Sequence, residues 1–169
     1  MEVLKINEAL DMAIKTEKDG IKFYTKAAEG TKDALGKKMF LSFVEDEKRH
    51  LDILKKLSCD EHVCIEDIED YSPRENLRTI FSDMPEDIRK MAVDASSDIV
   101  ALEVAMQMER LGYDQYMKAA KESDDKELKE IFEKLAFEEK EHYDMLDEAM
   151  SYLEDTGNWY MWYEYSFPT

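Results

Sequence analysis

The sequence predicts an all-α protein in which four long helices form one bundle. Glycine and proline are scarce, at five and three among 169 residues, which disfavours a turn-rich β fold. Charged residues make up 38% and hydrophobic residues 44%, a balance typical of amphipathic helices rather than of a disordered chain. Apolar residues also recur in alternating steps of three and four, the spacing of a buried helical seam. We expect one helical domain over residues 1–157 and a short aromatic tail over 158–169.

Each predicted helix has one inward-facing line of residues. The helices are expected at about 6–29, 32–57, 97–121 and 125–154. Gly30 and Gly157 follow the first and the fourth as stop signals. In chain order, the lines are Leu10, Ile14, Glu17, Ile21, Tyr24 and Ala28; Phe40, Phe43, Glu47, His50, Leu54 and Leu57; Leu102, Met106, Glu109, Tyr113, Tyr116 and Ala120; and Phe132, Leu135, Glu139, His142, Leu146, Ala149 and Leu153. The polar residues within these apolar lines require an explanation.

The connection over residues 58–96 is long enough to run from one end of a bundle to the other. It therefore predicts two helical hairpins joined by a crossover. Ser72 and Pro73 are expected to open a short helix within it, and the residues after Pro85 are a candidate for another. After Gly157, aromatic residues stand at every second position, a strand-like alternation. We expect this apolar tail to pack on its own bundle or on a second subunit, which favours a homodimer.

The charge of the chain excludes several classes of partner. A net charge of −18 argues against nucleic acid and against an anionic membrane surface. No apolar run approaches the ~20 residues that span a bilayer, and no signal peptide is visible. Cys59 and Cys64 cannot form a disulfide scaffold, and with His62 they lack a fourth ligand for structural zinc. We therefore expect a soluble, acidic, cytoplasmic protein.

The chain repeats itself at an offset of 92 residues. The segment 17–28 aligns with 109–120 through a shared glutamate, tyrosine and pair of alanines. Independently, Glu-Lys-Arg-His at 47–50 aligns with Glu-Lys-Glu-His at 139–142. Two matches with one offset predict two copies of a helical hairpin related by a pseudo-two-fold axis.

The polar residues in the seams have the spacing of metal ligands. Residues three apart on a helix differ by about 60° in direction, so the Glu-x-x-His pairs at 47–50 and 139–142 can each grip one ion. Glu17 and Glu109 supply one carboxylate from each remaining helix, and their positions suggest a bridge between two ions. Four carboxylates would balance two divalent cations, whereas burying them without metal costs several kcal/mol each. Oxygen and imidazole ligands suit iron, manganese or zinc.

These residues, the repeat and the crossover resemble the ferritin-like superfamily, and most closely the rubrerythrin family, over about residues 6–154. The resemblance implies a ferritin-like four-helix bundle and a non-haem di-iron oxidoreductase that reduces hydrogen peroxide in oxidative-stress defence. It implies two iron ions per chain with the ligands Glu17, Glu47, His50, Glu109, Glu139 and His142. It also implies that Glu47 and Glu139 bridge the irons while Glu17 and Glu109 are terminal ligands. This is the reverse of the assignment that spacing suggests, and we adopt it.

Two features depart from many members of the family. Many carry a rubredoxin domain with paired Cys-x-x-Cys motifs, which Cys59 and Cys64 do not provide. We therefore expect a separate electron donor such as rubredoxin. The family also often has a further glutamate one turn beyond the third-helix ligand. That place is Gly112 here, matched by Gly20 in the first repeat, and it leaves room beside the metals for peroxide or another diatomic ligand.

Tyr24 and Tyr116 lie seven residues beyond the lone glutamates, on the same helix face and about 10 Å along. Two interpretations stay open: a hydrogen bond or radical-quenching role beside the irons, or an ordinary core position. Three functions also stay open. We favour a peroxidase that acts on hydrogen peroxide. The alternatives are a ferroxidase or iron-handling protein that uses oxygen, and a bundle with a structural metal pair such as zinc.

Overall fold

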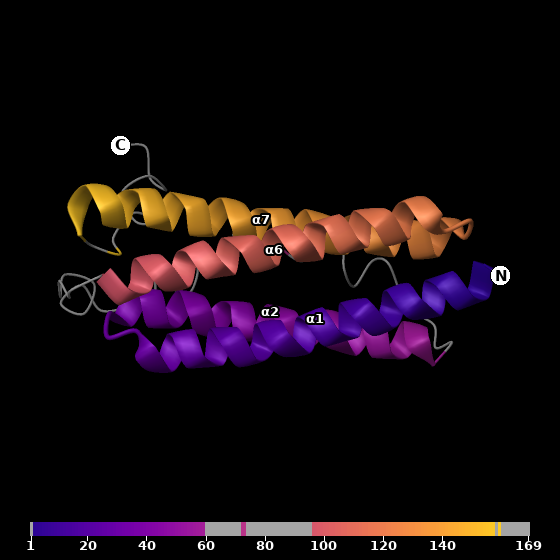
Figure 1. Ribbon diagram of the computed structural model, residues 1–169, viewed down its shortest axis with the longest axis horizontal. Coiled ribbons are helices and arrows are strands. Elements are labelled where there is room, and N and C mark those ends of the chain that lie inside the picture. The colour runs from indigo at the N-terminus through magenta and orange to yellow at the C-terminus, as the bar shows by residue number, and fades with distance from the viewer. Residues whose placement is uncertain (1, 60–71, 74–95, 158, 160–169) are drawn as a thin grey trace.

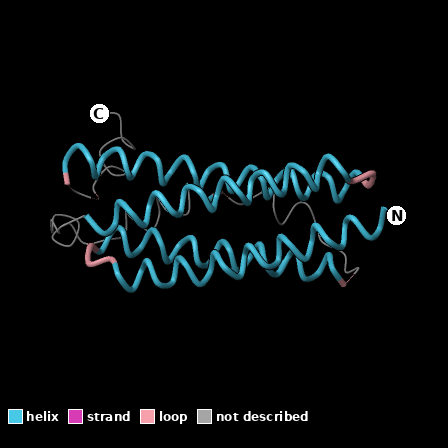
Figure 2. Tube along the Cα trace, in the orientation of Figure 1, coloured by secondary structure: helices cyan, strands magenta, loops and turns pink. Residues whose placement is uncertain are grey.

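Four long helices make up nearly all of the chain that the computed structural model describes, which is residues 2–59, 72–73, 96–157 and 159 (Figure 1). They are α1 (Glu2–Gly30), α2 (Ala34–Ser58), α6 (Ser96–Glu122) and α7 (Lys126–Thr156). The trace in Figure 2 contains no strand within these residues. The predicted all-α bundle is therefore confirmed. None of its helices is both long enough and apolar enough to cross a membrane.

The helices pair as two antiparallel hairpins. α1 packs mainly on α2, α6 packs mainly on α7, and α1 and α6 also contact each other (Figure 1). α2 ends and α6 begins at opposite ends of the bundle, so the chain between them must span its length. With 25 residues, α2 alone is about 37 Å long. The crossover is thus confirmed. Pro73, where a short helix is expected to open, is helical, but the rest of that helix, the helix expected after Pro85 and the alternation expected in the tail lie outside the described residues.

Local capping sets the helix boundaries. Asp33 caps α2, since its carboxylate accepts hydrogen bonds from the backbone nitrogens of Leu35 at 2.8 Å and Gly36 at 3.3 Å. The helix therefore begins at residue 34 rather than 32. Asp125 caps α7 in the same way through Leu128 N at 3.1 Å. Gly157 ends α7 at a φ of 72°, a left-handed conformation that favours glycine.

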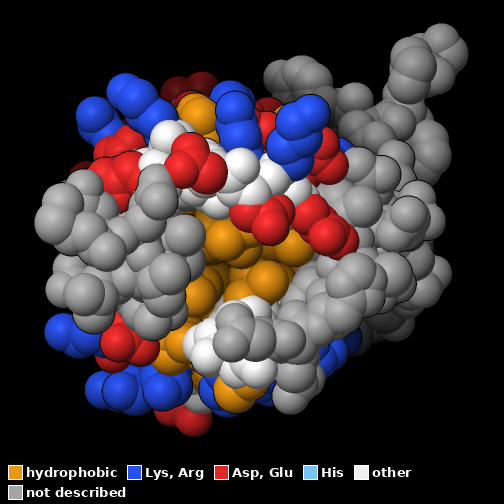
Figure 3. Space-filling model, turned by 90° about the vertical axis from the view of Figure 1, so that its right-hand side faces the viewer, with side chains coloured by type: hydrophobic (Ala, Val, Ile, Leu, Met, Phe, Trp, Pro, Cys, Tyr) orange, Lys and Arg blue, Asp and Glu red, His pale blue; other side chains and the backbone are white. Residues whose placement is uncertain are grey.

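The core consists of two apolar clusters with a polar layer between them. One contains Tyr24, Ala28, Leu35, Met39, Phe40, Phe43, Val44, Leu102, Ala105, Met106, Met145, Leu146, Ala149, Leu153 and Trp159. The other contains Leu10, Ala13, Ile53, Leu54, Tyr116, Ala119, Ala120, Ile131, Phe132, Leu135 and Ala136. Figure 3 looks onto the end of the bundle nearer the second cluster and shows hydrophobic side chains at its centre, with charged ones around them. On every helix, the polar members of the predicted seam fall between these two clusters.

Trp159 attaches the first part of the tail to the bundle. The residue is 5% exposed, and its ring packs edge-on against Phe40, with 5.7 Å between ring centroids. Its Nε1 donates a hydrogen bond to Asp98 Oδ2 at 2.8 Å. A Cβ at Gly36 would lie only 2.6 Å from the indole, so this contact requires glycine. The tail therefore begins by packing on its own bundle.

Candidate metal centre

Six buried polar side chains, drawn from all four helices, meet in the layer between the apolar clusters. They are Glu17 on α1, Glu47 and His50 on α2, Glu109 on α6, and Glu139 and His142 on α7. None is more than 4% exposed. The structure thus brings together every metal ligand that the sequence predicts.

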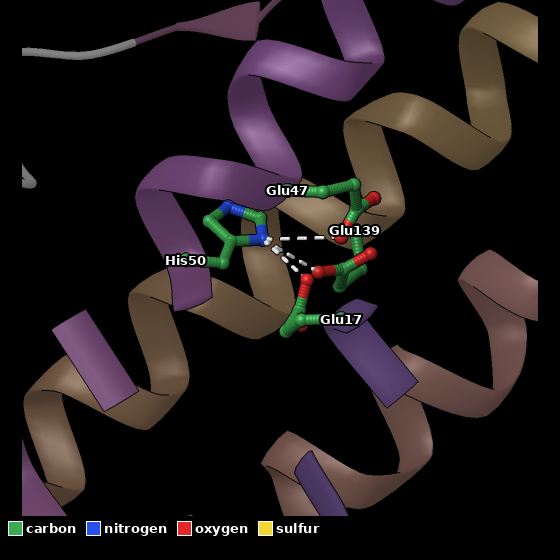
Figure 4. A group of neighbouring side chains, drawn as sticks. All are labelled: Glu17, Glu47, His50 and Glu139. Atoms are coloured by element: carbon green, nitrogen blue, oxygen red, sulfur yellow. Dashed lines mark ion pairs between the residues drawn. The ribbon is translucent and has the colours of Figure 1, made fainter. Parts of the chain in front are cut away.

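His50 is the centre of the first group (Figure 4). Its Nδ1 lies 3.0 Å from Glu139 Oε1, 3.7 Å from Glu17 Oε2 and 3.9 Å from Glu47 Oε2. Helices α1, α2 and α7 therefore each direct an oxygen toward one imidazole nitrogen.

His142 holds the equivalent place in the second group. Its Nδ1 lies 3.3 Å from Glu109 Oε2, and 3.9 Å from both Glu47 Oε1 and Glu139 Oε2. In each group, the four ligand atoms lie within 4.8 Å of one another. Glu47 and Glu139 belong to both groups, whereas each of the other four residues belongs to one. This sharing is the arrangement that the family resemblance implies, not the one that spacing suggests.

Unpartnered atoms in the first group show that it suits a cation. Glu17 Oε2, His50 Nδ1 and Glu139 Oε1 are fully buried and make no hydrogen bond. The last two are only 3.0 Å apart, yet their geometry is not that of a hydrogen bond. Buried polar atoms are nearly always paired, so three orphans facing one space indicate a missing common partner. Carboxylate oxygen and imidazole nitrogen are the donors that first-row divalent metals take.

Two buried acids, Asp46 and Glu138, orient the two histidines. His50 Nε2 lies 3.0 Å from Glu138 Oε2, and His142 Nε2 lies 3.0 Å from Asp46 Oδ2. Each acid can accept a hydrogen bond from Nε2, which leaves Nδ1 of the ring facing the carboxylates, as in metal-bound histidine. Sequence analysis missed both acids. They directly precede the two Glu-x-x-His pairs at the same offset of 92 residues, so the repeat could have found them.

Arg49 makes the surroundings of Glu138 different from those of Asp46. Its guanidinium forms an ion pair with Glu138, whose side chain is 2% exposed. Burial would raise the pKa of Glu138, but the hydrogen bond and charge of His50, followed by those of Arg49, hold it below the usual value. The residue that corresponds to Arg49 in the second repeat is Glu141. The first repeat thus supplies a cation that the second does not.

Tyr24 and Tyr116 connect the two hairpins reciprocally. The Tyr24 hydroxyl on α1 donates to Glu109 Oε1 on α6, and the Tyr116 hydroxyl on α6 donates to Glu17 Oε1 on α1. Burial, followed by the negative charge of the bonded glutamate, raises the pKa of both phenols well above 10, so both remain donors. Each tyrosine engages Oε1 and leaves Oε2 of the same carboxylate facing a histidine.

Without metal, the surroundings of this site favour bound protons. Burial raises the pKa of Glu47 well above its usual value, and the charges of Glu17 and Glu139 add to that effect. Burial alone would lower the pKa of both histidines. The surrounding carboxylates, led by Glu138 for His50 and by Glu109 for His142, reverse the effect and raise both pKa values well above 6.5. A bound cation would replace these protons.

A small cavity adjoins the shared carboxylates. It has about 10 Å³ available to the centre of a water molecule, room for about one such molecule. Its lining is Thr16, Glu17, Gly20, Tyr24, Glu47, Met108, Glu109, Gly112 and Glu139. A Cβ would lie 3.4 Å from Glu47 Cδ if placed at Gly20, and 3.2 Å from Glu139 Cδ if placed at Gly112. The two glycines therefore preserve the space beside these carboxylates.

The fold and the site together define a class of protein, the ferritin-like bundles whose four helices surround a carboxylate–histidine metal site. The sequence model of the rubrerythrin family matches residues 8–150, which is most of the chain. The chain therefore belongs to the rubrerythrin family, as its resemblance predicts. No curated protein and no solved structure matches it.

Proposed function

We propose that the chain binds two iron ions in this centre and reduces hydrogen peroxide to water. The observation that carries the proposal is the pair of four-residue groups joined by Glu47 and Glu139. In this assignment Glu17 and His50 would help to hold one ion, Glu109 and His142 would help to hold the other, and Glu47 and Glu139 would serve both. Four carboxylates and two divalent ions are neutral together, which offsets the cost of burial. Manganese or zinc could replace iron in the same ligands.

When bound in the ferrous state, the iron pair supplies one electron from each ion, as the two-electron cleavage of the O–O bond requires. The residues of the chain shape the site in which the peroxide would bind. The cavity beside Gly20 and Gly112 admits a small ligand, and the apolar clusters on both sides exclude bulk water. Tyr24 lines the cavity and donates its proton to Glu109, so its hydroxyl oxygen can accept a hydrogen bond from a ligand there.

The proposal extends to partners and setting. Each cycle needs two electrons, which we assign to a separate carrier protein of the rubredoxin type. We also propose that the protein works as a cytoplasmic homodimer in defence against oxidative stress. The first of these statements is tested by adding reduced rubredoxin and following its oxidation in the presence of peroxide.

The test is stopped-flow oxidation of the anaerobically iron-loaded protein by hydrogen peroxide and by oxygen, side by side. Binding of two irons per chain and much faster oxidation by peroxide would support the peroxidase. Faster oxidation by oxygen with continued turnover of added iron would replace it with a ferroxidase. Failure to bind two irons would leave a structural metal site. The Glu47→Gln variant, which keeps the shape of the side chain but weakens it as a ligand, is the matched control.

A further inference from the structure

A pocket opens between α6 and α7 and reaches the metal centre from outside. Its volume is about 350 Å³, within the range of small-molecule sites. Its floor is formed by Glu109 and Glu139, which also line the small inner cavity. Its walls are Arg110, Tyr113, Lys140, Tyr143 and Asp144. The pocket thus runs from exposed basic residues, past partly buried tyrosines, to two ligand carboxylates that are at most 3% exposed.

The pocket is much larger than hydrogen peroxide requires. The inner cavity has room for about one water-sized molecule, whereas the outer pocket has room for an organic group. Two tyrosine rings and the methylene stems of Arg110 and Lys140 provide apolar contact for such a group. The volume and lining therefore indicate a ligand with a compact aromatic or branched-alkyl part.

The charged residues that line the pocket restrict the functional group that the ligand can direct toward the metal centre. Glu109 and Glu139 form the floor and Lys140 is paired with Asp144 at the wall, so the lining, with three acids and two bases, has no excess of positive charge to attract an organic anion. Carboxylate oxygens only accept hydrogen bonds, so the group that reaches them must be a donor. A hydroperoxide is neutral near pH 7 and carries an O–H donor on its outer oxygen.

The other hairpin differs at the same places. At the offset of 92 residues, Ile21 and Leu51 correspond to the two pocket tyrosines. Ile21 packs against the first apolar cluster, and Leu51 is only 9% exposed. The tyrosine pair is thus specific to the α6–α7 hairpin, although the ligand pattern beneath it is common to both.

We propose that this pocket binds the organic part of an alkyl or aryl hydroperoxide, so that the chain reduces ROOH as well as hydrogen peroxide. The inference rests on the proposed function for its electrons. The O–O bond breaks as ROOH, two electrons and two protons give ROH and water. The electrons come from the reduced iron pair, which the external carrier protein restores. The alcohol leaves through the pocket by which the hydroperoxide came.

Binding is tested first without redox chemistry. The full-length protein with zinc is titrated with 2-phenyl-2-propanol, the alcohol formed from cumene hydroperoxide, and the ring signals of its tyrosines are followed by NMR. We expect saturable shifts at Tyr113 and Tyr143. Replacement of the exposed Arg110 by tryptophan should fill the opening of the pocket and weaken binding at least tenfold. Lys18→Trp, the exposed equivalent on α1, should leave binding unchanged. Unmoved tyrosine signals, or equal losses in both variants, would overturn the proposal.

Reactivity is tested on the iron-loaded protein with cumene hydroperoxide and hydrogen peroxide. We expect both to oxidise the centre, and Arg110→Trp to lower the ratio of their rates at least tenfold while Lys18→Trp leaves the ratio unchanged. Oxidation by hydrogen peroxide alone would overturn this proposal and leave the peroxidase standing. Oxidation by neither, with the alcohol still bound in the pocket, would instead overturn the peroxidase and with it the turnover proposed here.

Discussion

The two hairpins agree in what they direct toward the centre of the bundle and differ in what surrounds it. Toward the centre, each contributes a lone glutamate, a Glu-x-x-His pair, a tyrosine and a glycine, all at one offset. Farther out, Arg49 in the first repeat corresponds to Glu141 in the second, and Ile21 and Leu51 correspond to two tyrosines. The comparison teaches that metal ligation constrains both repeats equally, whereas their outer contacts have diverged. The following experiments break or sharpen this comparison.

The largest effect should come from the carboxylates that both sites share. Glu47→Ala or Glu139→Ala removes a ligand from each group, so we expect the protein to lose both metal ions. Glu17→Ala removes a ligand from one group and should cost one ion. Metal content per chain, measured after removal of loosely bound ions, distinguishes the two outcomes. Glu103→Ala, on the exposed side of α6, is the control and should keep both ions. Two ions retained by Glu47→Ala would contradict the sharing.

The pH dependence of metal binding should reflect both halves at once. The carboxylates around them raise the pKa values of His50 and His142, which favours the protonated form of both histidines in the metal-free protein. Metal must displace these protons, so affinity should fall as the pH falls, by about tenfold per pH unit for each proton displaced. Zinc competition with a chelator at pH 6, 7 and 8 measures the slope. A slope of zero over this range would show that the histidines are already neutral.

The third test targets the surroundings of the buried acids Asp46 and Glu138, where the two hairpins differ. Arg49→Met should leave the buried carboxylate of Glu138 without its guanidinium and destabilise the protein by about 2 kcal/mol. Glu141, at the equivalent position, accepts a hydrogen bond from Ser72 at 3.3 Å, so Glu141→Met should cost less, about 1 kcal/mol. Urea unfolding of the two variants gives the comparison. Equal losses would mean that Arg49 contributes no more than its counterpart.

The smallest effect should separate the two glycines. Alanine favours a helix by about 1 kcal/mol over glycine, and the Cβ contact opposes that gain. The contact is ordinary at Gly20, 3.4 Å from Glu47 Cδ, and tighter at Gly112, 3.2 Å from Glu139 Cδ. We expect Gly20→Ala to be the more stable of the two by about 0.5 kcal/mol in thermal unfolding. The reverse order would show that Glu139 moves aside more easily than Glu47.

The sequence predicts the fold and the inner site because both leave periodic signals. Every residue assigned to the four inward lines is buried or partly buried. The helix limits fall within a few residues of those expected, with the largest difference at α1, which begins four residues early. No capping residue marks that start, so the pattern of apolar residues was the only guide to it.

The parts that the sequence does not predict depend on contacts between distant segments. Trp159, just after α7, lies against Gly36 near the start of α2, and no spacing within either segment indicates this. The ion pair of Arg49 with Glu138 joins α2 to α7 in the same way. Asp46 is different: it precedes its Glu-x-x-His pair as Glu138 precedes the other, so closer attention to the repeat would have found both.

The shared carboxylates have a consequence for the origin of the molecule. Each four-residue group takes at least one member from each hairpin, so neither hairpin alone holds a complete set of ligands. Two identical half-length chains, paired about a true two-fold axis, would hold both sets. Duplication and fusion of a gene for one such hairpin would therefore produce the 92-residue repeat. Every ancestor in that series, as a dimer or as a fused chain, would have had the metal centre. The outer residues of the fused chain, freed from identity, could then diverge as Arg49 and Glu141 have done.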